Sequence, residues 1–218
     1  MCARGSAGRR RLLRGAQFAV RGAGADRGRT GKGLPAVSTM AVATSAFREA
    51  AEQAGTLREL AAYVERALVR FAADAGDQPD ALEQFATAVL VEVSEEEREV
   101  RLLHRGHPPP YLIRGGRVTS LEPSAPGLPL GLGMPEGVGV SGCDTFPFHQ
   151  GDYLLLVTDG VTEARDRHGA YYEPCTRLAN RDFRTASEVV NTLVADVTDW
   201  TGGRRHDDMA ILALTPVR

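Results

Sequence analysis

The chain contains an apolar strand that runs directly into an Asp-Gly pair, and this feature most restricts how the protein can fold. Four large apolar residues at 154–157 run without interruption up to Thr158, Asp159 and Gly160, as in a strand that is covered on both faces. A second acidic pair, Asp207-Asp208, precedes another apolar run near the C-terminus. Two such strands would each deliver an aspartate to one end of a sheet. Because Mg²⁺ and Mn²⁺ prefer oxygen ligands, the pattern predicts metal-assisted chemistry.

The overall composition is that of a globular domain. The 218 residues are 43% hydrophobic and 25% charged, and a chain of this length can bury one full core. No window approaches eighteen consecutive apolar residues, so we expect no membrane span. The three cysteines are too far apart for a disulfide framework or a zinc site. This usage favours a reducing, cytoplasmic location.

The first 35 residues differ sharply from the rest. They contain nine Lys or Arg and one acid, Asp26, so they carry +8, whereas the whole chain carries −2 and the remainder therefore −10. Eight of the 24 glycines also fall here. A basic, Gly-rich segment without periodicity predicts disorder over residues 1–33. A nucleic-acid arm, a twin-arginine signal and a transit peptide are alternatives, but Phe18 is the only aromatic residue available for stacking on bases. We therefore expect no nucleic-acid partner.

From Leu34 onward the hydrophobic pattern becomes regular. It predicts, in chain order, helices over 36–54 and 57–71, hairpins of 86–93 with 100–104 and of 111–113 with 118–121, a strand at 154–157, a helix over 185–201 and a strand over 209–214. This order favours an α+β fold in which helices cover largely antiparallel sheets.

Five motifs follow one another in an order that resembles a known family. They are Gly106-His107-Pro108-Pro109-Pro110, Leu128-Pro129-Leu130-Gly131, Gly151-Asp152, Thr158-Asp159-Gly160-Val161-Thr162-Glu163-Ala164 and Asp207-Asp208-Met209-Ala210. Together they resemble the metal-dependent PPM-type serine/threonine phosphatases, in the SpoIIE-like bacterial branch. The resemblance covers residues 34–218 and implies an antiparallel β-sandwich flanked by helices.

The resemblance also implies a site and an activity. Asp159 and Asp207 match the catalytic, metal-binding aspartates of the family, and Gly160 and Asp208 complete the implied metal set. The family binds two Mn²⁺ or Mg²⁺ ions, whose bridging water attacks phosphoserine or phosphothreonine. The implied partner is a phosphorylated bacterial signalling protein, such as an anti-anti-sigma-factor-like protein. From the residues alone, each aspartate could instead cap a turn or face solvent.

His107 is a candidate general acid. Three prolines follow it in the chain, so the sequence favours a histidine that positions a rigid loop by hydrogen bonding.

The chain departs from the family before Gly31. The family carries its first metal-ligating Asp three residues earlier, where this chain has Gly28. Asp26 is two residues out of register, which in a strand displaces a carboxylate by roughly 6–7 Å. The family's preceding strands are also missing from the sequence. A catalytically impaired, phosphatase-like binding module is therefore the alternative function.

A change of reading frame would explain this departure. Codons can be chosen for residues 25–30 so that the next frame encodes Leu-Ile-Gly-Asp-Val, which is the segment that the family carries. We hypothesise that residues 1 to about 30 derive from a shifted frame or a misplaced start.

Overall fold

The computed structural model describes residues 12–22, 33–74, 84–94, 96, 98–133, 142–203 and 208–216. The elements are β1 (Leu12–Gly22), α1 (Gly33–Gln53), α2 (Leu57–Asp74), β2 (Gln84–Ser94), β3 (Glu99–Arg105), β4 (Tyr111–Arg114), β5 (Arg117–Ser120), β6 (Cys143–Pro147), β7 (Tyr153–Val157), α3 (Asp159–Thr162), α4 (Pro174–Arg177), α5 (Ala186–Trp200) and β8 (Ile211–Leu214).

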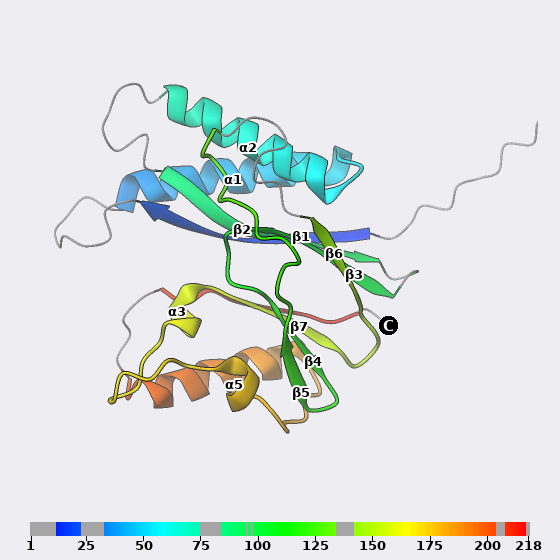
Figure 1. Ribbon diagram of the computed structural model, residues 1–218, viewed down its shortest axis with the longest axis vertical. Helices are drawn as coiled ribbons and strands as arrows, with labels where there is room; N and C mark the ends of the chain where they lie inside the picture. The colour runs from blue at the N-terminus through cyan, green and yellow to red at the C-terminus, as the bar shows by residue number, and fades with distance from the viewer. Residues whose placement is uncertain are drawn as a thin grey trace, which may run out of the picture.

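These elements form four layers, with two sheets packed face to face between helices (Figure 1). The first sheet has the order β1-β2-β3-β6 and is covered by α1 and α2, and the second has the order β5-β4-β7-β8 and is covered by α5. All strand pairings within the sheets are antiparallel. The α+β class predicted from the sequence and the flanked antiparallel sandwich implied by the family resemblance are confirmed.

Each central strand is buried on both faces, which explains its nearly continuous apolar sequence. In β2, Ala86, Ala88 and Leu90 pack with α1 and α2, whereas Val89, Val91 and Val93 pack between the two sheets. In β7, Leu154 and Leu156 pack between the sheets, whereas Tyr153, Leu155 and Val157 pack with α5. Because successive side chains of a strand point to opposite faces, one short segment contributes to two cores.

Side chains and a glycine close the ends of the helices. Thr56 Oγ1 accepts a hydrogen bond from Glu59 N at 3.1 Å, and the Glu59 carboxylate accepts one from Gly55 N at 2.7 Å, close to a capping box. Thr185 caps α5 by accepting from Glu188 N. After α5, Gly203 N donates to Thr198 O at 2.9 Å, which closes the helix as a C-terminal glycine motif does. The two hairpins are also confirmed.

None of the helices in the described ranges is long and apolar enough to cross a membrane.

The structure differs from the expectation of disorder over residues 1–33, because residues 12–22 form β1. This strand pairs with β2 from Leu12↔Ser94 to Gly22↔Gln84. The physical reason lies in β2, whose buried backbone needs hydrogen-bonding partners along both edges. A strand thus precedes α1, although the family resemblance implied that the first strands are missing. Residues 1–11 and 23–32 lie outside the described part, so their predicted disorder stays a prediction.

Candidate metal site

Asp159 lies where β7 ends and the short helix α3 begins. β8 runs antiparallel to β7, with Val157 opposite Ile211, so the residues that follow β7 lie beside those that precede β8. Thr158 N donates to Ala210 O at 3.1 Å, which extends the pairing one step beyond the strands. Asp208 in the second acidic segment is thus placed beside the residues that follow β7, whereas the meeting of Asp159 with Asp207 stays a prediction. Asp207 lies outside the described residues.

The side chain of Thr158 joins the two segments. Its Oγ1 accepts a hydrogen bond from Ala210 N at 2.9 Å and donates one to Asp208 O at 3.3 Å. Thr158 is only 5% exposed, so water cannot easily replace these partners. Sequence reasoning gave Thr158 no role. The sequence feature that could have indicated this role is the position of Thr158, a hydroxyl residue between a buried strand and an aspartate.

Gly160 is required at its position by a close approach of the backbone. A Cβ atom on residue 160 would lie 2.3 Å from Asp208 O and 2.8 Å from Asp208 C. Real Cβ atoms are not found this close to other heavy atoms. Any larger residue would therefore push the two segments apart.

The oxygen atoms at this point suit a hard divalent cation. Asp159 is half-buried, and its Oδ1 accepts a hydrogen bond from Gly160 N at 3.0 Å. Asp208 is exposed, and the carbonyl oxygen of Gly160 is a further donor of the hard type. In the part of the chain that the structure describes, no three His, Cys, Asp or Glu side chains gather as a metal-binding group. The kind of donor fits Mn²⁺ or Mg²⁺, but the described residues alone do not complete a site for two ions.

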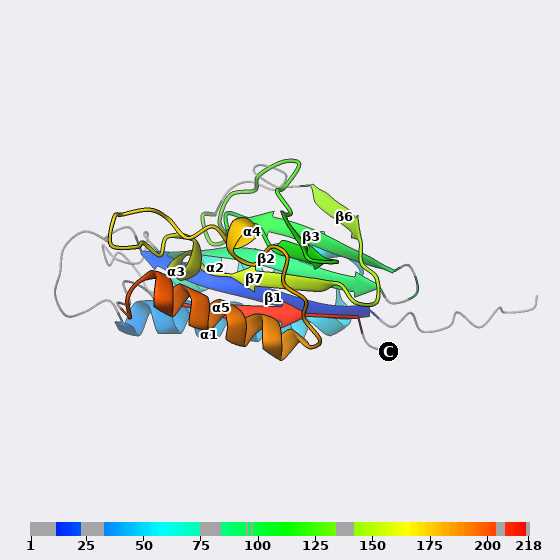
Figure 2. The ribbon, with the colours of Figure 1, turned by 90° about the horizontal axis from the view of Figure 1, so that it is seen from below.

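Figures 1 and 2 show that α3 lies at the same end of the molecule as the N-terminal end of α1. Gly33 is the first residue of α1. Gly28 and Asp26 themselves lie outside the described residues.

His107 attaches its loop to β2, and the neighbouring Gly106 packs against the loop that carries Pro129. His107 Nδ1 lies 3.2 Å from Thr87 Oγ1 on β2, and the imidazole is 6% exposed. The neighbouring Gly106 has φ +73°, and a Cβ atom there would lie 3.0 Å from Pro129 Cγ. The prediction that His107 positions its loop by hydrogen bonding is confirmed.

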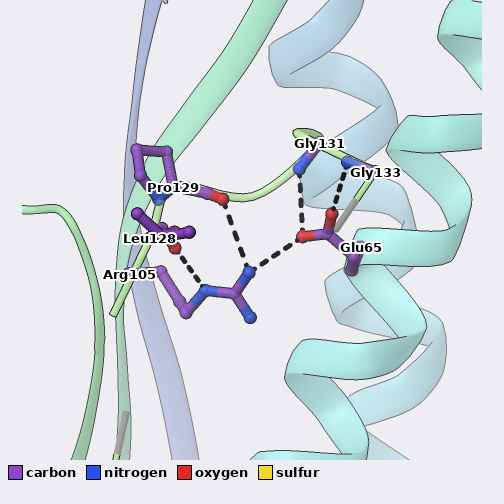
Figure 3. Close-up of polar contacts among 6 residues, drawn as sticks. All are labelled: Glu65, Arg105, Leu128, Pro129, Gly131 and Gly133. Carbon is purple, nitrogen blue, oxygen red and sulfur yellow. Dashed lines mark hydrogen bonds and ion pairs between the residues drawn. The ribbon is translucent and has the colours of Figure 1, made fainter. Parts of the chain in front are cut away.

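A buried ion pair fixes the Leu128-Pro129-Leu130-Gly131 motif (Figure 3). Arg105 Nη2 lies 3.0 Å from Glu65 Oε2 on α2, and the Arg105 guanidinium also donates to the carbonyl oxygens of Leu128 and Pro129. The Glu65 carboxylate accepts hydrogen bonds from Gly131 N at 3.0 Å and Gly133 N at 3.2 Å. Burial lowers the pKa of Arg105, and Glu65 offsets part of that effect. This contact joins α2, β3 and the loop into one unit.

The Gly151-Asp152 motif serves a structural purpose. Arg114 donates from Nε to Asp152 Oδ1 at 2.9 Å and from Nη2 to Oδ2 at 2.6 Å, and His149 N donates to Oδ2 at 2.6 Å. Burial raises the pKa of Asp152, but the hydrogen bonds from Arg114 and His149 outweigh it, so the net pKa is lowered. The carboxylate pins the turn that starts β7.

Sequence comparison connects the chain with one family. The sequence model described as Stage II sporulation protein E (SpoIIE) matches residues 29–216. No curated protein sequence matches the chain significantly.

The fold is similar to that of solved phosphatase domains. The PP2C phosphatase domain with a regulatory fragment of SpoIIE from Bacillus subtilis matches with a TM-score of 0.66 at 16% identity, over 93% of this chain and 62% of that one. The SiaA-PP2C domain of Pseudomonas aeruginosa matches with 0.66 at 19% identity, over 94% and 79%. The catalytic domain of the serine/threonine phosphatase PstP in complex with two manganese ions matches with 0.61 at 15% identity, over 92% and 98%. The chain thus spans less than two thirds of that SpoIIE structure and shares the fold of all three.

Proposed function

The chain belongs to the SpoIIE family, and from that premise we propose that it is a metal-dependent protein serine/threonine phosphatase. One observation carries the proposal: Asp159 and Asp208, 49 positions apart in the sequence, lie on segments joined by the hydrogen bonds of Thr158 and by the backbone contact of Gly160. The PstP catalytic domain, which has the same fold, is a complex with manganese. Oxygen ligands that meet at one sheet end suit such ions.

In this proposal Asp159, the carbonyl oxygen of Gly160, Asp207 and Asp208 hold two Mn²⁺ or Mg²⁺ ions. Such ions supply an activated water nucleophile and neutralise charge on the phosphoryl oxygens. The chain's own contribution is to place the ligands beforehand. Gly160 N orients one oxygen of Asp159, and the Thr158 hydroxyl fixes the backbone of Asp208 and Ala210. Ligands held in this way need little reorganisation when the reaction occurs.

We propose phosphoserine or phosphothreonine on a bacterial signalling protein as the substrate, with an anti-anti-sigma-factor-like protein as the specific candidate. The SpoIIE family match supports this choice. We propose a cytoplasmic setting and no nucleic-acid partner. A salt-sensitive DNA affinity that vanishes on deleting residues 1–33 would contradict the last point.

The test is hydrolysis of a phosphoserine peptide and of p-nitrophenyl phosphate by the full chain, with and without Mn²⁺. We expect metal-dependent turnover that falls by roughly a hundredfold or more in Asp159→Ala, because a metal-ion catalyst contributes several kcal/mol to the transition state. Mn²⁺ binding by calorimetry should weaken in the same variant. Turnover that needs neither the metal nor Asp159 would refute the proposal.

A second candidate is a catalytically impaired module that binds phosphorylated partners without hydrolysing them. It is favoured by Gly28, which stands where the family resemblance implies the first ligand Asp, and by a family match that begins only at residue 29. Phosphopeptide binding without turnover would support it. The nucleotide sequence upstream of the Gly31 codon tests the cause, since a shifted frame encoding Gly-Asp-Val is expected if residues 1 to about 30 are not native.

A further inference from the structure

An exposed loop follows α3 directly, and both of its ends are fixed in the core. Ala164 and Tyr172 are 6% and 1% exposed, and Tyr172 N donates to Ala164 O at 2.9 Å. The next pair outward, Arg165 and Tyr171, forms an antiparallel bridge. The loop of residues 165–171 therefore leaves the core at a fixed point.

The interior of this loop is also ordered by hydrogen bonds. Asp166 Oδ1 accepts from His168 N at 2.8 Å and from Ala170 N at 2.9 Å. The carboxylate of Asp166 is thus hydrogen-bonded to the backbone of its own loop, and these bonds lower the pKa of Asp166. The loop thus presents its cationic side chains from a defined backbone.

Arg165 is held by an aromatic ring rather than by a carboxylate. Its Cζ lies 4.4 Å from the ring centre of Tyr171, and its Nη2 donates to the Tyr171 hydroxyl. Across the described ranges no carboxylate pairs with Arg165, in contrast to Arg114 and Arg177, which pair with Asp152 and Asp196. A guanidinium stacked on a ring is already oriented and keeps its full charge for an anionic ligand.

Arg165 lies close to the candidate metal ligands along the chain. It is six residues after Asp159, and Glu163 N folds back to donate to Asp159 O at 2.7 Å. Six residues span at most about 20 Å, even when fully extended. An extended substrate peptide rises by about 3.3 Å per residue. When its phosphorylated residue is bound at Asp159, residues a few positions away in the peptide can therefore reach Arg165.

We infer that Arg165, with Arg167 beside it on the same loop, binds acidic residues that flank the phosphorylated residue of a protein substrate. This inference rests on the proposed phosphatase function. Guanidinium and carboxylate groups match in charge and in geometry. The whole chain carries −2, so an acidic peptide gains nothing from the overall charge and needs a local cation. Tyr171, which is 48% exposed, holds the Arg165 guanidinium in place for this contact.

The experiment compares two fluorescent phosphoserine peptides of equal length, one with Asp and Glu around the phosphoserine and one with Ala and Ser there. Their Kd values are measured by anisotropy at low salt for the full chain, for Arg165→Glu and for Arg117→Glu. Arg117 is exposed at the start of β5, so Arg117→Glu controls for the same change of net charge. An exposed ion pair changes binding by up to about fivefold, and reversing a charge converts attraction into repulsion.

We expect the wild type and Arg117→Glu to prefer the acidic peptide by roughly fivefold, with a preference that shrinks at high salt. Arg165→Glu should lose the preference. Arg165→Ala, which adds no repulsion, should lose most of it, and thermal melting should show that both variants fold. Equal binding of the two peptides by the wild type, an intact preference in Arg165→Glu, or its loss in Arg117→Glu would each overturn the inference. If the preference depends on Arg165 but the wild type hydrolyses neither peptide, the inference stands and the proposed catalytic function fails.

Discussion

The main chain of Gly160 lies so close to Asp208 that a Cβ atom on residue 160 would be 2.3 Å from the Asp208 carbonyl oxygen. This contact joins α3, which follows β7, to the segment that precedes β8 through backbone atoms. The position of the Asp159 carboxylate is therefore tied to the segment that carries Asp208. In the proposed enzyme, the metal ligands would be held together by packing as well as by the ions.

Gly160→Ala should damage the site more than it damages the fold. The added methyl group must displace the Asp208 backbone, and overpacking of this kind costs about 1–3 kcal/mol. A shift of about 1 Å in a catalytic group can lower the rate by about a hundredfold. We expect Mn²⁺-dependent turnover to fall by that order and Mn²⁺ affinity to fall with it. Gly142→Ala is the control, because a Cβ atom there makes only an ordinary contact, 3.5 Å from Ser124 Oγ.

Thr158→Val removes the hydroxyl of Thr158 but keeps the shape of the side chain, so it should show what the hydroxyl contributes. Valine has nearly the same volume but leaves the Ala210 N–H without its 2.9 Å partner, and an unsatisfied buried donor costs about 1–3 kcal/mol. Thr158→Ser keeps the hydroxyl and should retain most of the stability and the metal affinity. Urea unfolding and Mn²⁺ titration of the two variants provide the measurement. Equal stability of the valine and serine variants would show that the hydroxyl does not hold the segments.

Asp152 should make the stability of the protein depend on pH in the acidic range. Its folded pKa lies below its ordinary value, so its contribution is fully present above the unfolded pKa of about 3.9 and is lost as the pH falls through the folded pKa. The free energy of unfolding should therefore fall more steeply below about pH 4 in the wild type than in Asp152→Asn. At pH 7 the variant should be less stable by about 1.5–3 kcal/mol, because hydrogen bonds to a charged group are lost. Asp182→Asn, at an exposed position, controls for the loss of one carboxylate.

The sequence predicted the layered fold well because hydrophobic periodicity is a local signal. The unbroken apolar run at residues 154–157 indicated a strand buried on both faces, and the structure shows that both faces are covered. The helix caps Thr56 and Thr185 are local features of the same kind, because their bonding partners lie three residues away. The strand β1 was missed because a basic, Gly-rich composition outweighed its pattern. The position of β1 is set by its pairing with β2, which is distant in the sequence.

The sequence motifs predicted only part of the candidate metal site. The motifs indicated that the two acidic segments meet, and the structure shows Thr158 and Gly160, the neighbours of Asp159, in contact with Asp208. The close approach of Gly160 to Asp208, the bridging hydroxyl of Thr158 and the stacking of Arg165 on Tyr171 all depend on tertiary geometry, so residue type alone does not reveal them. The metal roles of Asp159, Gly160, Asp207 and Asp208 stay predictions.

The buried pair of Glu65 and Arg105 should behave as one energetic unit (Figure 3). The two side chains are 17% and 8% exposed. Glu65→Gln or Arg105→Leu should each lower the free energy of unfolding by about 3–5 kcal/mol, because each leaves the other charge buried without its partner. The double variant should cost less than the two losses together, with a coupling of about 1–3 kcal/mol in a double-mutant cycle measured by urea unfolding.

Arg181→Leu provides the matched control for this cycle. Arg181 pairs with Asp196 at 3.2 Å, but its side chain is 41% exposed, so its loss should cost no more than about 1 kcal/mol. If the losses from Glu65→Gln and Arg105→Leu are simply additive, the two residues do not act as a pair. In that case α2 would hold the Leu128–Gly131 segment through the hydrogen bonds from Gly131 N and Gly133 N to Glu65 alone.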